Sequence, residues 1–199
     1  MLSETKAAPD RAIAPTVVTT PSFAVAILAF SILYAAVIAP RLISGDMPAF
    51  AATAVLAAAL IVLSAWDVTT LRLPDAITLP LIVFGIATAP PDAMIWRALS
   101  AAASGGMLYA IAIAYKHVRH RDGLGMGDVK LVAAAGAWVG LESLSGVLLI
   151  ACASAILTIS AVALLNRQIK STDRVAFGPF LALGLWTVWL YNPIAALAM

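Results

Sequence analysis

Residues Ala49–Trp66 read AFAATAVLAAALIVLSAW and carry no charged side chain. A helix rises about 1.5 Å per residue, so this stretch comes close to spanning the roughly 30 Å hydrocarbon core of a bilayer. A helix also satisfies its own backbone hydrogen bonds, which lipid cannot do. The stretch therefore predicts a membrane-spanning helix, and Asp67 follows directly at its end.

The remainder of the chain has the same apolar character. Of its 199 residues, 63% are hydrophobic and 11% are charged, which is more apolar surface than a water-soluble fold can bury. Short polar breaks separate the apolar stretches, a pattern that favours helices over a porin-like barrel. We therefore predict an all-α, polytopic membrane helix bundle with about six to seven transmembrane helices. The expected spans are Ser22–Pro40, Ala49–Trp66, Ala76–Ala89, Met94–Tyr115, Val129–Gly140, Leu144–Leu165 and Phe177–Leu197.

The basic residues set the expected orientation. If the N-terminus is cytosolic, every Lys and Arg except Arg41 and Arg97 falls on the cytosolic side, as the positive-inside rule requires. Residues 1–21 are then expected to form a cytosolic tail ahead of a membrane-embedded domain at residues 22–199. Because Val129–Gly140 is too short to cross a bilayer alone, we expect this span to be short, tilted or partly re-entrant.

Several kinds of partner and cofactor are not expected. The net charge of +2 is explained by topology and by attraction to anionic lipids, so the bilayer is the expected partner and nucleic acid is not. Cys152 is the only cysteine, which excludes an intrachain disulfide. His117 and His120 have a spacing that can bind metal on a helix, but no third ligand stands near them in the sequence. We predict no metal and no cofactor, and the oligomeric state is left open.

Carboxylates at the membrane are costly and therefore informative. Asp67 ends the second expected span and Asp128 opens the fifth, so the topology puts both at the same cytosolic boundary. Each is also compatible with a simpler role as a helix cap or a solvated charge, and Asp75 and Asp122 are assigned to that role. An ion- or proton-coupled transporter is the alternative function, although its carboxylates would lie nearer the bilayer midplane.

A close pair of carboxylates has a specific chemical use. Mutual repulsion raises one apparent pKa, so the pair holds a single proton near neutrality. One member then takes a proton from water while the other donates to a scissile carbonyl. Gly125 and Gly127, just before Asp128, fit this use because glycine allows unusual backbone angles and close approach of an extended peptide.

Three stretches around these residues resemble the type IV prepilin peptidases, which are GxGD-type aspartyl proteases of bacterial inner membranes. The stretches are Asp67–Pro80 (DVTTLRLPDAITLP), Gly123–Leu131 (GLGMGDVKL) and Phe177–Gly184 (FGPFLALG). The intramembrane proteases of the presenilin kind share Gly-x-Gly-Asp but lack the Leu-Pro-Asp segment. The ordered set of three therefore favours the prepilin peptidases.

The resemblance implies a catalytic dyad of Asp67 and Asp128, with Gly125, Gly127, Lys130 and Pro74 in substrate-binding or supporting positions. It implies prepilin or pseudopilin substrates of type IV pili or type II secretion, cut after a short basic leader. Many members also carry an N-terminal domain with Cys-x-x-Cys motifs and methylate the new N-terminus. Because no cysteine precedes Asp67, we expect the peptidase activity alone.

One further expectation concerns tryptophan. Trp96, Trp138, Trp186 and Trp189 fall towards the outer ends of predicted spans. Tryptophans are enriched where a membrane meets water, so the four are expected to form an interfacial belt.

Overall fold

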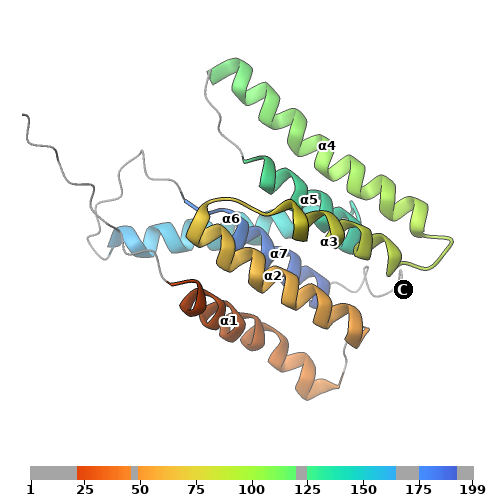
Figure 1. The fold of residues 1–199 in the computed structure, drawn as a ribbon, viewed down its shortest axis with the longest axis horizontal. Coiled ribbons are helices and arrows are strands. Elements are labelled where there is room, and N and C mark those ends of the chain that lie inside the picture. The colour runs from red at the N-terminus through yellow and green to blue at the C-terminus, as the bar shows by residue number, and fades with distance from the viewer. Residues whose placement is uncertain (1–21, 46–48, 120–124, 165–174, 192–199) are drawn as a thin grey trace, which may run out of the picture.

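A computed structural model describes residues 22–45, 49–119, 125–164 and 175–191. Within these ranges the chain forms seven helices and no strand, which confirms the all-α prediction (Figure 1). The helices are α1 (Phe23–Ser44), α2 (Phe50–Thr70), α3 (Asp75–Ala87), α4 (Met94–Arg119), α5 (Met126–Val139), α6 (Leu144–Leu164) and α7 (Gly178–Tyr191). The predicted cytosolic tail, residues 1–21, lies outside the described residues.

Four helices are long and apolar enough to cross a bilayer, namely α1, α2, α4 and α6. The chain is therefore a multi-pass membrane protein. The other three helices have only 13 or 14 residues each. At about 1.5 Å per residue they extend roughly 20 Å, which is short of the hydrocarbon core. The short span expected near residues 129–140 is one of these helices.

Successive helices run in alternating directions through the bundle (Figure 1). The carboxyl ends of α2, α4 and α6 therefore lie at the same side as the amino ends of α3, α5 and α7. This arrangement brings the end of α2 near the start of α5, although more than fifty residues separate them along the chain.

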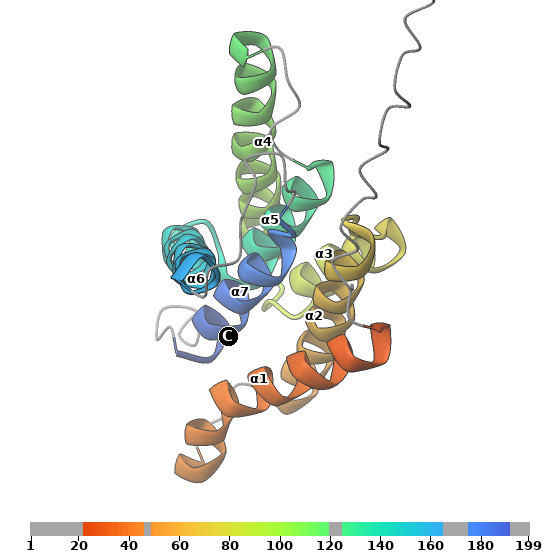
Figure 2. The same ribbon diagram turned by 90° about the vertical axis from the view of Figure 1, so that its left-hand side faces the viewer.

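The short helices α5 and α7 form the interior of the bundle. Figure 2, a view turned by 90°, places α7 among α2, α5 and α6, and α7 contacts all three. Most residues of α5 and α7 are buried, whereas α6 buries only one stripe. That stripe, Leu144, Val147, Ala151 and Ala155, has the three- and four-residue spacing of one helix face. The longer outer helices thus shield the short inner ones from lipid.

The predicted tryptophan belt is wrong for three of its four members. Trp138, Trp186 and Trp189 are buried, each no more than 2% exposed, and only Trp96 faces outward. Each buried indole donates a hydrogen bond inside the bundle: Trp138 to the Leu81 carbonyl at 2.8 Å, Trp186 to the Tyr34 carbonyl at 3.2 Å and Trp189 to the Thr53 hydroxyl at 3.1 Å. A bundle with internal acceptors can bury tryptophan without leaving its N–H unpaired.

At the carboxyl end of α5, the buried side chain of Arg97 contacts the last turn of the helix. Arg97, near the start of α4, is 7% exposed, and its Nη1 donates to the carbonyl of Trp138 at 2.5 Å. Trp138 stands in the last turn of α5, where carbonyls lack partners within the helix. The guanidinium therefore satisfies a buried carbonyl and fixes α4 against α5.

Candidate active site

A cavity of about 310 Å³ lies where the end of α2 meets the starts of α3 and α5. Half of its ten lining residues carry a charged side chain, whereas the interior of the bundle is mainly apolar. The lining residues are Asp67, Leu71, Arg72, Leu73, Asp75, Gly125, Met126, Gly127, Asp128 and Lys130. The structure thus brings together five of the six residues proposed from sequence, and the sixth, Pro74, lies between two lining residues.

Asp67 projects from the last turn of α2 and is only 6% exposed. Its Oδ2 accepts a hydrogen bond of 2.9 Å from the backbone N–H of Gly178, the first residue of α7. A Cβ atom at position 178 would stand 2.6 Å from the same oxygen, so only glycine permits this approach. The carboxylate is therefore enclosed by the start of α7 as well as by its own helix.

Asp128 lies in the first turn of α5 and is half-buried. Two effects together raise the pKa of Asp128 from 3.8 to about 6. Burial is the larger, and repulsion from the nearby Asp67 charge is the smaller. A hydrogen bond from the Gly125 backbone acts in the opposite direction, because it favours the ionised carboxylate. The two carboxylates thus interact electrostatically within one cavity, and Asp128 holds a proton near neutral pH more readily than an isolated Asp.

The two glycines before Asp128 have ordinary backbone conformations, and the expected close approach of a substrate peptide stays a prediction. Gly125 has φ −71° and ψ 135°, an ordinary extended backbone, and Gly127 is not among the described residues with positive φ. The expectation of unusual backbone angles is therefore wrong. A Cβ at Gly127 would lie 2.8 Å from the Cβ of Leu73, so the glycine lets α5 start close against the link between α2 and α3.

An ion pair joins the two sides of the cavity. Lys130 on α5 donates from Nζ to Oδ1 of Asp75, the first residue of α3, at 2.6 Å. From the sequence, Asp75 was interpreted as a helix cap or a solvated charge and Lys130 as a substrate-binding or supporting residue, so this ion pair was not expected. Pro74 supplies the N-cap of α3, and its carbonyl accepts from Ile77 and Thr78. The segment after α2 is thereby attached to α5.

The turn that leaves α2 has a strained residue. Leu71 caps the helix with φ 53°, the only non-glycine with positive φ among the described residues. Its N–H donates to the backbone carbonyl of Asp67 at 2.8 Å. A left-handed conformation is unfavourable for leucine by about 1 kcal/mol or more, and such strain is found most often at functional sites. The turn directs Leu71 and Arg72 to the cavity that Asp67 lines.

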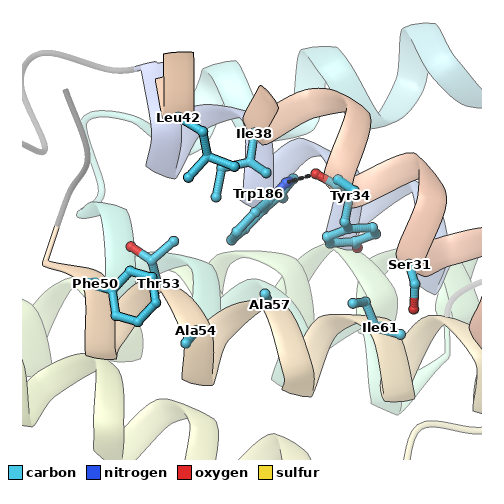
Figure 3. Close-up of a pocket in the computed structure, with 11 residues that line it drawn as sticks. Ser31, Tyr34, Ile38, Leu42, Phe50, Thr53, Ala54, Ala57, Ile61 and Trp186 are labelled. Carbon is cyan, nitrogen blue, oxygen red and sulfur yellow. Dashed lines mark hydrogen bonds between the residues drawn. The ribbon is translucent and has the colours of Figure 1, made fainter. Parts of the chain in front are cut away.

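A second hollow of about 290 Å³ lies between α1 and α2 (Figure 3). It is lined mainly by aliphatic and aromatic side chains, and Trp186 closes it from α7. We call it the apolar groove. Its one titratable side chain, Tyr34, lies within 3.4 Å of the Ser64 hydroxyl, in hydrogen-bonding contact. The groove therefore offers no acid or base for chemistry, and the charged cavity is the candidate active site.

The profile of the Type IV leader peptidase family matches residues 54–160 of this chain. The chain belongs to this family. The match includes Asp67, Asp75, Asp128 and Lys130, and every residue that lines the charged cavity lies inside the family region. Gly178, which contacts Asp67, lies beyond it.

Named relatives agree with this membership. The prepilin leader peptidase/N-methyltransferase of Escherichia coli (strain K12) is 42% identical over 125 residues, covering 61% of this chain and 55% of that protein. The protein of the same name from Burkholderia pseudomallei (strain 1026b) is 38% identical over 137 residues, covering 65% of this chain and 42% of that protein. The chain spans about half the length of the curated relatives it matches. No solved structure matches it.

Of the two histidines and Asp122, the structure describes only His117, which is not among the residues that line the charged cavity. His117 lies in the last turn of α4, with Nδ1 3.2 Å from the Ile113 carbonyl, and His120 lies outside the described residues. In the described part of the chain, no three His, Cys, Asp or Glu side chains converge as metal ligands would. Asp122, interpreted from the sequence as a helix cap or a solvated charge, also lies outside the described residues.

Proposed function

We propose that this chain is an aspartic endopeptidase of the bacterial inner membrane that removes the leader from type IV prepilins or pseudopilins. The observation that carries the proposal is the placement of Asp67 and Asp128 in one cavity at the end of the bundle. Membership of the Type IV leader peptidase family and the printed names of the relatives supply the substrate class.

The pair supports hydrolysis without a covalent intermediate. The ionised carboxylate takes a proton from water as the oxygen of that water bonds to the scissile carbonyl carbon, and the protonated partner donates to the carbonyl oxygen. Collapse of the tetrahedral intermediate then breaks the C–N bond, and the amine leaves with a proton returned through the pair. The raised pKa of Asp128, about 6, fits a dyad that holds one proton near neutrality.

The distribution of basic residues supports a cytosolic cavity and a cytosolic N-terminus. Of the lysines and arginines that the structure describes, Arg72, Lys116, Arg119 and Lys130 lie at the cavity end, and Arg41 and Arg97 lie at the opposite end. By the positive-inside rule the cavity end faces the cytosol. A prepilin with a cytosolic leader and a membrane-embedded helix would present its cleavage site at that depth.

In this proposal the other predicted residues shape the cavity. Gly127 lets the start of α5 lie close to the α2–α3 link, and Gly125 leaves room beside the Asp128 carboxylate. Lys130 and Pro74 hold the start of α3 in place. The relatives' names combine a leader peptidase with an N-methyltransferase, and we propose the peptidase activity for this chain because the carboxylate pair accounts for it.

Co-expression of the chain with a prepilin tests the dyad. Asp67→Asn and Asp128→Asn each keep the side-chain size and remove the titratable group, so we expect leader removal to fall at least about a thousandfold, as when catalytic groups that act as a unit are lost. Asp92→Asn, in the exposed turn before α4, is the matched control and should cleave normally. Gel mobility of the pilin gives the readout. Full-rate cleavage by either dyad variant would reject the proposed function.

The client is resolved by the same assay. A pilus subunit, a type II secretion pseudopilin and a tight-adherence pilin are each co-expressed with the wild-type chain. The proposal expects at least one to lose its leader in a manner that depends on Asp128. Failure with all three, in cells that contain the folded enzyme, would remove prepilins as the substrate class.

A further inference from the structure

We propose that Gly178 is a positioning residue of the active site, because its backbone N–H at the start of α7 holds the Asp67 carboxylate in place and favours its ionised form. The proposal rests on the function assigned above to the Asp67 and Asp128 pair. It adds a fourth element, α7, to a site otherwise built from α2, α3 and α5.

The contact has the features of a specific interaction. The donor and acceptor are 111 residues apart in sequence, both residues are buried, and the hydrogen bond is 2.9 Å long. The first N–H groups of a helix have no partner within the helix, and its amino end carries partial positive charge. A carboxylate that accepts from this position is therefore favoured in its charged state.

Glycine is required for this approach. A Cβ at position 178 would lie 2.6 Å from Oδ2 of Asp67, closer than a Cβ normally comes to a nonbonded atom, and 3.0 Å from Cγ. Pro179 follows as the second residue of α7, where its lack of an N–H leaves no donor unpaired. The Gly-Pro pair thus presents one backbone donor to Asp67 and leaves no side chain in the way.

Other charged groups near Asp67 also affect how leader cleavage depends on pH. Asp128 and Lys130 face the cavity from α5, Asp75 faces it from α3, and Arg72 faces it from the link after α2. On α7 the one titratable side chain is Tyr191, at the far end. The Asp67 charge also contributes to the raised pKa of Asp128, because two close carboxylates repel each other when both are ionised.

Gly178→Ala in the full chain tests the proposal. The added methyl group displaces the carboxylate, so we expect kcat for leader removal to fall at least about tenfold with little change in KM. Losing a hydrogen bond to the ionised form should also move the acid limb of the pH–activity profile upward by roughly one pH unit. Wild-type kcat together with a wild-type pH profile would overturn the proposal, while the Asp→Asn results would still judge the dyad.

Two other glycines provide controls. A Cβ at Gly184, also on α7, would collide with the Val147 carbonyl oxygen, so Gly184→Ala disturbs packing against α6 and not the carboxylate. It should lower thermal stability but keep the wild-type pH profile per folded molecule. Gly106 on α4 has open space around it, so Gly106→Ala should change neither kcat nor the pH profile. An acid-limb shift in Gly184→Ala equal to that in Gly178→Ala would mean that α7 acts only through packing.

A second measurement decides the matter if Gly178→Ala does not fold. In wild-type protein labelled with ¹⁵N-glycine, the amide resonance of Gly178 should shift as Asp67 titrates. The shift should disappear in Asp67→Asn and persist in Asp92→Asn. A Gly178 resonance that is insensitive to pH in folded wild-type protein would overturn the proposal.

Discussion

Two hollows along α2, the charged cavity of about 310 Å³ and the apolar groove of about 290 Å³, have nearly the same size but very different linings. In the charged cavity, carboxylates and a lysine are held by partners from other helices. In the apolar groove, the polar groups of Tyr34, Thr53 and Trp186 are paired inside the bundle, as Figure 3 shows for the Trp186 indole and the Tyr34 carbonyl. The side chains that line a hollow, and not its volume, therefore identify the site of chemistry.

The comparison predicts that the apolar groove governs stability and the charged cavity governs activity. Trp186→Ala should lower the free energy of unfolding by about 3–5 kcal/mol, because a buried indole leaves a cavity and loses its contact with Tyr34. Thermal unfolding in detergent measures the loss, and Trp96→Ala, at an outward-facing tryptophan, should change it far less. Cleavage per folded molecule should stay near wild type. If Trp186→Ala lost most of its cleavage activity but kept its stability, the assignment of stability to the apolar groove and activity to the charged cavity would be wrong.

The next largest effect is the pH dependence of stability. The pKa of Asp128 is about 6 in the folded chain and 3.8 ordinarily, so the folded state binds this proton more tightly than the unfolded state does. The contribution of Asp128 to stability is therefore fully present below pH 3.8 and is lost as the pH rises through about 6, by up to about 3 kcal/mol, less where water enters the cavity.

Asp128→Asn isolates this contribution. The stability difference between the wild type and the variant should change between about pH 4 and about pH 6 and then become constant, following the shifted titration. Thermal unfolding in detergent across that range supplies the measurement. A difference that is flat throughout would show that the carboxylate is hydrated as in water and that the cavity does not enclose it.

The smallest expected effect on stability belongs to the Lys130 and Asp75 ion pair. Both side chains are partly exposed, so Lys130→Met should alter the free energy of unfolding by no more than about 1 kcal/mol. Leader cleavage should nevertheless fall several-fold, because the pair holds α3 against α5 beside Asp128. Reversing the pair with Lys130→Asp and Asp75→Lys should recover part of the activity. Arg72→Met, which removes one positive charge from the same lining, controls for net charge.

The sequence was sufficient for the membrane class, the positions of the helices and the meeting of Asp67 and Asp128. Hydropathy and the distribution of basic residues report how deep each residue lies, and two carboxylates at equal depth can share a cavity. They do not report which face of a helix meets which neighbour. The contacts of Asp67 with Gly178 and of Asp75 with Lys130 depend on that rotation, as does the burial of Trp138. These were therefore missed or assigned to simpler roles.

The buried Arg97 explains how α5 can be so short. A helix of 14 residues must stop within the depth of the hydrocarbon, where no water is present to accept its last carbonyls. The guanidinium of Arg97 reaches in and takes the place of that water at the Trp138 carbonyl. Because Arg97 supplies this donor, α5 does not need to reach the far membrane surface to satisfy its last carbonyls. The helix can therefore be short and still begin beside the cavity, where it carries Asp128.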